Sequence, residues 1–212
     1  MWWMLALAGI GMGATFGWLW WRTLRYVALG DSIAFGIGSL TLFGYPPRLA
    51  KALAKRLRRR IALRNHALYG LTSAQILGLV EADERVRNAI RAAGLITLNV
   101  GGNDLLHCDY QASCLPGALV EFRTNWEGIL REIRLLNPRA PLFTITLYNP
   151  YPLGDIRRPA VAEAIGALNE IILNQAILDR YGVTGVAELS ALFAGQECNW
   201  TWFCAIGDPH PT

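Results

Sequence analysis

The stretch Tyr26–Ser32, Y-V-A-L-G-D-S, decides how this 212-residue chain folds. Four apolar residues followed by Gly30 predict a short buried strand that ends in a tight turn. Ser32 would begin a helix on that turn, with its hydroxyl exposed at the sheet edge and its backbone N–H free to donate. A Gly-Asp-Ser turn is also a common helix cap, so this stretch alone does not establish a reactive serine.

Strand-like and helix-like segments alternate along the rest of the chain. Short apolar runs predict further strands at 61–68, 95–100, 141–147 and 183–187. Helical spacing and capping residues predict helices at 48–55, 72–93, 116–136 and 159–180. Five strands separated by helices favour an α/β fold, with a parallel sheet covered on both faces. Ligands bind beyond the carboxyl ends of such strands, so functional residues are expected there.

Polar and glycine-rich clusters follow the predicted strands. Gly70 follows the second, Asn103 lies in Gly-Gly-Asn-Asp after the third, and Asp208-Pro-His210-Pro comes near the end of the chain. The Gly70 N–H and the Asn103 amide are neutral donors that suit developing negative charge. The His210 imidazole, whose ordinary pKa is near 6.5, can take a serine proton and return it to a leaving alcohol.

The order and spacing of these four clusters resemble those of the SGNH hydrolases, also called GDSL lipases or esterases, from Tyr26 to the C-terminus. The resemblance implies a flavodoxin-like three-layer α/β/α fold and an acyl-enzyme mechanism that uses no metal and no cofactor. It implies Ser32 as nucleophile, His210 as general base and Asp208 as the group that orients His210. It also implies an oxyanion hole made of the Ser32 N–H, the Gly70 N–H and the Asn103 side-chain amide.

The chain departs from the family pattern in two places. The family usually has Asp three residues before the histidine, where this chain has Gly207, and Asp208 is only two residues before His210. Side chains at i and i+2 share a face in extended backbone, so contact is still expected. The family also continues past this His-Pro into a helix. The domain, 22–212, is therefore expected to lack that helix and to hold His210 less firmly.

Several other residues near the predicted site have competing interpretations. His66 is expected to be structural, whereas His107 would contact substrate or replace His210 as base. Asp104 is expected to hold its loop through backbone hydrogen bonds, and 149–152 to form one wall of the site. Three aromatic residues are interpreted either as packed core or as an acyl-chain wall: Trp200, Trp202 and Phe203.

The first 21 residues carry no charged side chain, and tryptophans crowd both ends of the segment. About 20 apolar residues suffice to cross a bilayer as a helix, and tryptophan favours the interface. The segment lacks the basic start and the well-placed cleavage site of a signal peptide. We therefore expect residues 1–21 to be an uncleaved membrane anchor; a buried helix of the domain is the alternative.

The four cysteines form two pairs of identical C-x5-C spacing: Cys108 with Cys114 and Cys198 with Cys204. Two local disulfides are the simplest interpretation and imply an oxidising compartment, whereas four reduced thiols are the alternative. Arg22 and Arg25 follow the hydrophobic segment and favour a cytoplasmic domain by the positive-inside rule. The disulfides outweigh them, so the catalytic domain is expected outside the cytoplasm.

The formal net charge is +4, and the densest basic run is Lys55–Arg60, at the end of a predicted helix. A solvated helix end is the simplest interpretation and suits the helix dipole. Contact with anionic lipid headgroups is the alternative; no recognition motif supports nucleic acid as a partner. The predicted function is hydrolysis of lipid, lysophospholipid or glycan esters. An inactive lipid- or glycan-binding module and an acyltransferase are the alternatives, and the oligomeric state stays open.

Overall fold

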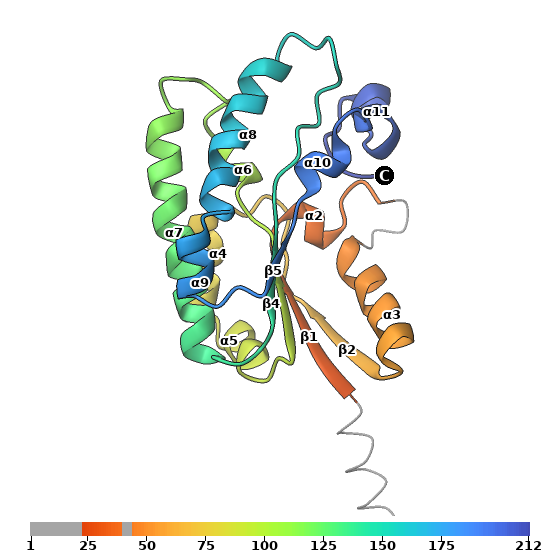
Figure 1. Cartoon of the computed structure of the whole chain (residues 1–212), viewed down its shortest axis with the longest axis vertical. Helices are drawn as coiled ribbons and strands as arrows, with labels where there is room; N and C mark the ends of the chain where they lie inside the picture. The colour runs from red at the N-terminus through yellow and green to blue at the C-terminus, as the bar shows by residue number, and fades with distance from the viewer. Residues whose placement is uncertain (1–22, 40–43) are drawn as a thin grey trace, which may run out of the picture.

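The computed structural model describes residues 23–39 and 44–212, so the predicted anchor at 1–21 lies outside the described residues. A parallel sheet of five strands runs through the middle of the domain in the order β2-β1-β3-β4-β5 (Figure 1). The strands are β1 (Thr23–Leu29), β2 (Arg60–Asn65), β3 (Leu95–Leu98), β4 (Leu142–Ile145) and β5 (Gly185–Ala187). The predicted parallel α/β sheet is thereby confirmed.

Helices cover both faces of this sheet. They are α2 (Ser32–Phe35), α3 (Tyr45–Leu57), α4 (Ser73–Ala82), α5 (Glu84–Arg91), α6 (Gly102–Leu106), α7 (Leu115–Leu136), α8 (Arg158–Ile172), α9 (Gln175–Arg180), α10 (Leu189–Phe193), α11 (Glu197–Trp200) and α12 (Phe203–Ile206). The α3 helix lies on one face, and α4, α7 and α8 lie on the other, which makes three layers (Figure 1).

The sheet centre is apolar because β1 and β3 are buried on both faces. Residues 26–29 of β1 and all of β3 are buried, as expected for near-continuous apolar strands in a parallel sheet. The register aligns Tyr26 with Leu95 and Leu29 with Leu98, so both strands end at the same level. That alignment brings the turn after β1 beside the residues that follow β3.

Two predicted helices are each broken in two by a capping residue. Asp83 ends α4 and caps α5, because its carboxylate accepts from the backbone N–H groups of Arg85 and Val86. Asn174 caps α9 in the same way, through the N–H of Ile177. The second strand also ends earlier than predicted, so His66 follows it.

The segment Arg158–Arg180, which contains α8 and α9, is the one among the described residues that is long and apolar enough to cross a membrane. In this fold it is a core element, because α8 buries Val161, Ile165 and Leu168 in the main apolar core. Its apolar character is therefore explained by packing on the sheet.

Candidate active site

Ser32 begins α2 directly after the carboxyl end of β1. The Asp31 side chain caps this helix by accepting the Ile33 N–H at 3.0 Å. Asn99, which follows β3, donates its side-chain amide to the same Asp31 oxygen at 2.7 Å. A Cβ at Gly30 would lie 2.2 Å from the Asn99 Oδ1, so only glycine leaves room for this contact. The turn that presents Ser32 is therefore fixed from behind by a buried carboxylate and a buried amide.

Ser32, His210 and Asp208 form a continuous hydrogen-bonded chain. The His210 Nε2 lies 2.8 Å from the Ser32 Oγ, and its Nδ1 lies 2.5 Å from the Asp208 Oδ1. The His210 backbone N–H also donates to Asp208, at 2.9 Å. A proton held on Nδ1 by this carboxylate leaves Nε2 free to accept the serine proton. The two-residue spacing between Asp208 and His210 thus permits the contact.

The electrostatics around His210 favour an ionised Asp208. Burial would by itself raise the pKa of Asp208, but the two hydrogen bonds from His210 and the charge of the imidazole hold that pKa below its usual range. A negative Asp208 can orient the imidazole and stabilise an imidazolium as it forms.

The end of the chain is held in place by backbone pairing. Thr201 and Pro211 form an antiparallel bridge, and the Trp202 N–H donates to the His210 carbonyl at 3.2 Å. The Tyr148 hydroxyl, which comes from the segment after β4, donates to the Pro209 carbonyl at 2.7 Å. These contacts hold the residues on both sides of His210, and the expectation that it is held less firmly than in the family stays a prediction.

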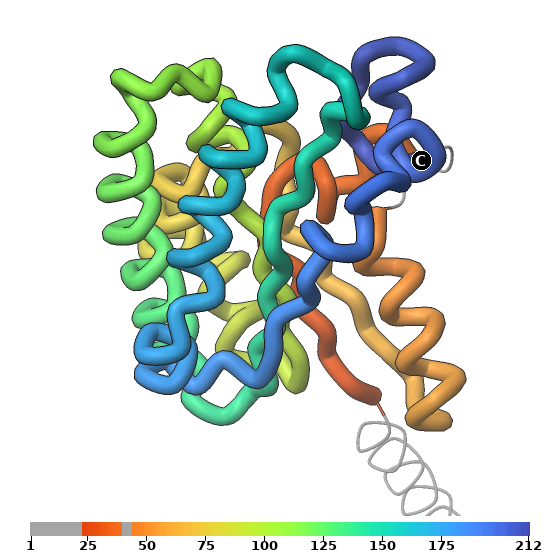
Figure 2. Tube along the Cα trace, turned by 45° about the horizontal axis from the view of Figure 1, so that its top comes forward, coloured from red at the N-terminus to blue at the C-terminus, as the bar shows by residue number. Residues whose placement is uncertain are grey.

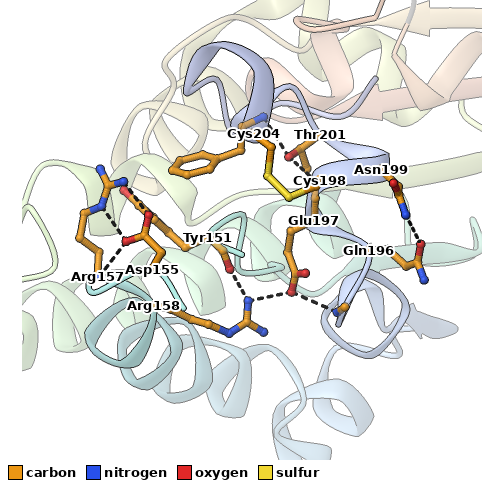
Figure 3. The surroundings of a disulfide bond; sticks show 12 residues. Tyr151, Asp155, Arg157, Arg158, Gln196, Glu197, Cys198, Asn199, Thr201 and Cys204 are labelled. Atoms are coloured by element: carbon orange, nitrogen blue, oxygen red, sulfur yellow. Dashed lines mark hydrogen bonds and ion pairs between the residues drawn. A yellow bond between two sulfur atoms is a disulfide. The ribbon is translucent and has the colours of Figure 1, made fainter. Parts of the chain in front are cut away.

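A disulfide closes a loop within this terminal segment, and an ion pair fastens the segment to α8 (Figure 3). Cys198 is bonded to Cys204, and the neighbouring Glu197 accepts from the Arg158 guanidinium at 2.8 Å. Burial would raise the pKa of Glu197, yet its hydrogen bonds and the charge of Arg158 keep that pKa below its usual range. Arg158 also donates to the Tyr151 carbonyl, which ties the loop before α8 to the same point.

The second disulfide, Cys108–Cys114, links the end of α6 to the start of α7. Both predicted cysteine pairs are thus bonded in the structure. The first residues of α6 carry part of the site, so this bond lies close behind it. An oxidising compartment stays a prediction.

The predicted oxyanion-hole residues come from three different segments of the chain, each of which follows a strand. Asn103 lies in the first turn of α6, lines the cavity beside Ser32, and donates its side-chain amide to the Leu71 carbonyl at 2.8 Å. Gly70 lies in the turn after β2 with a φ of 77°, a conformation that favours glycine. Its neighbour Tyr69, rather than Gly70, is among the residues lining the cavity. A role for the Gly70 N–H therefore stays a prediction.

A cavity of about 360 Å³ opens beside Ser32 and His210. Apart from Asp31, Ser32, Asn103, Asp208 and His210, its lining is apolar or aromatic. Its aliphatic residues come from α2, the loop after α2, α6, the segment after β4, and α8. They are Ile33, Ile37, Leu105, Leu106, Leu147 and Ile165. Pro150 also lines the cavity, as expected for the 149–152 wall. An apolar group beside the serine would fit this lining.

The other candidate residues do not line the cavity. His66 is half-buried after β2, where burial lowers its pKa, and His107 is an exposed residue at the end of α6. Asp104 accepts the Ser73 N–H, which confirms its predicted role in holding a loop. The three aromatic residues of the terminal segment do not line the cavity. Trp202 donates to the Gly38 carbonyl, and Phe203 packs on Tyr151.

A buried polar network behind the serine was not predicted. Tyr45 of α3 donates to Thr97 at 3.1 Å and to the Asn99 oxygen at 3.4 Å, which links α3 to the Asn99–Asp31 pair. Burial raises the pKa of Asp31 to about 6, although the hydrogen bonds from Ile33 and Asn99 oppose the shift. A polar Asn99 directly after a buried strand was the available signal, because a buried amide needs partners.

The sequence is similar to those of known lipases and acylhydrolases. Residues 28–212 match a model of the GDSL-like lipase/acylhydrolase family. The chain is 29% identical over 131 residues to the uncharacterised protein YpmR of Bacillus subtilis, covering 58% of this chain and 51% of that protein. It is 29% identical over 142 residues to the spore germination lipase LipC of Bacillus licheniformis, covering 61% of this chain and 66% of that protein. The matched region thus spans between half and two thirds of these relatives.

Solved structures show the same fold. A lipase from a goat rumen metagenome superposes with a TM-score of 0.74 at 24% identity, covering 89% of this chain and 90% of that one. Phospholipase A1 from Streptomyces albidoflavus superposes with a TM-score of 0.64 at 20% identity, covering 89% and 92%. Both likenesses establish the three-layer architecture and extend to almost the whole of each chain.

Proposed function

Since the chain belongs to the GDSL-like lipase/acylhydrolase family, we propose that it hydrolyses carboxylic esters through an acyl-enzyme on Ser32. The observation that carries the proposal is the hydrogen-bonded chain from the Ser32 Oγ through His210 to Asp208, at the mouth of an apolar cavity. A serine next to a base that is itself oriented by a carboxylate is the arrangement that activates a hydroxyl nucleophile.

The reaction follows from this arrangement in two halves. The Ser32 Oγ attacks the ester carbonyl carbon while its proton moves to the His210 Nε2. The C–O bond to the alcohol then breaks, His210 returns that proton to the leaving oxygen, and the acyl group stays on Ser32. A water molecule gives its proton to His210 and attacks the acyl carbon. The bond from the acyl carbon to the Ser32 Oγ then breaks, His210 gives the proton to that oxygen, and the carboxylic acid leaves.

Developing negative charge on the carbonyl oxygen needs donors. The Ser32 backbone N–H, the Gly70 N–H and the Asn103 amide are the proposed donors, and each is neutral. Removing one such donor typically slows acyl transfer by about 10²–10³-fold. In the free structure the Asn103 amide donates to the Leu71 carbonyl, so it would exchange or share that partner when an oxyanion forms.

The cavity indicates an ester with an aliphatic acyl group longer than acetyl. Leu105, Leu147 and Ile165 line it beside the serine, and its volume is about 360 Å³. Each methylene moved from water into such a lining gains about 0.8 kcal/mol, or roughly a fourfold preference. An acetyl group would leave most of this apolar surface unused.

We also propose that residues 1–21 anchor the protein in a membrane, with the domain outside the cytoplasm. The support for the anchor is the absence of charge from those residues, and the support for the outside location is the pair of disulfides.

The test is hydrolysis of p-nitrophenyl esters of increasing acyl length by residues 22–212, with Ser32→Ala beside the unchanged protein. Activity should rise beyond acetate and be lost in Ser32→Ala. Ser190→Ala is the matched control and should keep full activity, because Ser190 lies on α10 and does not line the cavity. Equal rates in the Ser32→Ala and unchanged proteins would refute the mechanism. Product analysis with an added alcohol separates hydrolysis from acyl transfer.

A further inference from the structure

Positive charge is concentrated in one part of the fold. Residues 32–80 contain eight Lys or Arg residues and no Asp or Glu, whereas the chain from Glu81 onward has more acidic than basic residues. In space these cations belong to α3, the turn after it, and the edge strand β2. We define the basic face as seven of the eight exposed cations in this group: Arg48, Lys51, Lys55, Arg56, Arg58, Arg60 and Arg64.

Within the residues that the structure describes, the basic face has no acidic counterpart. None of its members forms an ion pair with an acidic side chain in the described part of the chain, although many arginines elsewhere do. Leu57, among these cations, keeps 46% of its surface exposed. Unpaired like charges repel one another, so an external anionic surface would relieve the repulsion.

The basic face lies largely at the end of the sheet opposite the active site. Arg60 is paired in register with Thr23, the first residue of β1, whereas Ser32 follows the last residue of that strand. Seven residues of strand separate the two ends, a length of about 23 Å. The end of α3 and the start of β1 lie together at one end, and the C-terminus lies toward the other (Figures 1 and 2).

We propose that the basic face docks on the surface of an anionic phospholipid bilayer. Two observations favour lipid over another polyanion. The 21 uncharged, tryptophan-rich residues and Arg22 precede Thr23 in the sequence, and Thr23 pairs with Arg60, so the basic face lies beside the residue at which that bilayer-suited segment joins the domain. Leu57 also gives the basic face an apolar contact that can enter the headgroup region.

Docking in this way sets how the active site is presented. With the foot of β1 at the bilayer, the Ser32 site opens at the far end of the sheet, away from the headgroups. A consequence that rests on the proposed function is that the ester reaches the enzyme from the aqueous side. Esters in the supporting bilayer would then be poor substrates, and water-soluble or polymer-borne esters good ones.

The charges set the size of the expected effect. Each Lys or Arg near an anionic surface contributes about a fivefold gain in binding, so removing three lowers the docked population on the order of a hundredfold. The attraction weakens with salt, because the screening length falls from about 10 Å at 0.1 M to about 3 Å at 1 M. If these charges serve only to keep the edge strand β2 from pairing with another chain, hydrogen exchange at the basic face should not depend on the lipid.

The test uses the full chain, reconstituted in vesicles of phosphatidylcholine or of phosphatidylcholine with phosphatidylglycerol. Amide hydrogen exchange is followed by mass spectrometry across 51–64. Exchange there should slow in the anionic vesicles and recover in high salt. The K55Q/R56Q/R60Q variant should lose the difference between the two lipids. The control variant R85Q/R123Q/R131Q removes the same charge from α5 and α7 and should keep the difference.

Two outcomes overturn the proposal: equal exchange at 51–64 in both lipids, or a lipid effect that K55Q/R56Q/R60Q leaves intact. Slower exchange on adding duplex DNA, with no effect of anionic lipid, would assign the basic face to nucleic acid instead. Exchange in β3 shows that each variant is folded. Fluorophosphonate labelling of Ser32 in the same samples reports the proposed function separately, so either idea can fail without the other.

Discussion

Replacing Asp31 with asparagine should stabilise the protein at neutral pH. The Asp31 carboxyl is 2% exposed, and burial raises its pKa from the ordinary 3.8 to about 6. Its partners are two donors, the Ile33 N–H and the Asn99 amide, and an asparagine oxygen can accept both. The substitution therefore removes the buried charge and keeps the hydrogen bonds that present Ser32.

The sign and size of this change in stability follow from proton linkage. A raised pKa means that the folded protein holds this proton more tightly than the unfolded chain. The contribution to stability is present below about pH 4 and is lost as the pH rises through about 6. A pKa difference of about 2 corresponds to about 3 kcal/mol, so Asp31→Asn should gain up to about 3 kcal/mol at pH 8 and almost nothing at pH 4.

Urea unfolding of residues 22–212, followed by tryptophan fluorescence between pH 4 and pH 8, measures this difference directly. Asp83→Asn is the control of opposite sign, because hydrogen bonds from Arg85 hold the pKa of Asp83 below its usual range. That variant should be less stable than the unchanged protein, by an amount that is nearly constant above about pH 5, because the pKa of Asp83 lies below that range in both the folded and the unfolded chain. A pH-independent difference between Asp31→Asn and the unchanged protein would refute the assignment of a buried, strained charge behind Ser32.

Three further predictions concern the site itself. The Cys198→Ala/Cys204→Ala variant should lose about 2 kcal/mol of unfolding free energy and label more slowly with a fluorophosphonate, because the bond closes the loop whose Thr201 and Trp202 pair with the backbone around His210. Labelling as fast as in the unchanged protein would contradict this. Asn103→Ala should lower kcat by about 10²–10³-fold with little change in KM, and an unchanged kcat would remove Asn103 from the oxyanion hole. Ile165→Phe should shift the preferred acyl chain to shorter lengths in the ester series, because Ile165 lines the cavity; an unchanged profile would place the chain elsewhere.

The strands of the sheet could be predicted because the apolar runs in the sequence are the same segments that the fold buries. The apolar runs ending at Leu29 and Leu98 are buried strands whose carboxyl ends meet, so Ser32 and Asn103 were expected at the same edge. Helix boundaries were harder to predict, because one residue decides them. Asp83 and Asn174 each sit inside an apolar periodicity that continues past them, yet each caps a new helix.

The contacts that fix His210 could not be predicted from the sequence. Glu197 and Arg158 are 39 residues apart, and nothing local indicates that they pair. The Asn99–Asp31 bond likewise spans 68 residues and depends on the register of β1 and β3. Long-range polar pairs of this kind follow from the packed fold rather than from periodicity, so the strength of the His210 support could not be predicted.

The most direct test of the proposed mechanism is to locate the residue that is covalently labelled. The domain is treated with a fluorophosphonate, and peptide mass spectrometry locates the adduct in the unchanged protein, in Ser32→Ala and in His210→Gln. The proposed mechanism predicts one adduct, on Ser32, that is absent from Ser32→Ala and forms far more slowly in His210→Gln, since His210 lies 2.8 Å from the serine oxygen. An adduct on another residue, or labelling of Ser32 at the same rate without His210, would contradict it.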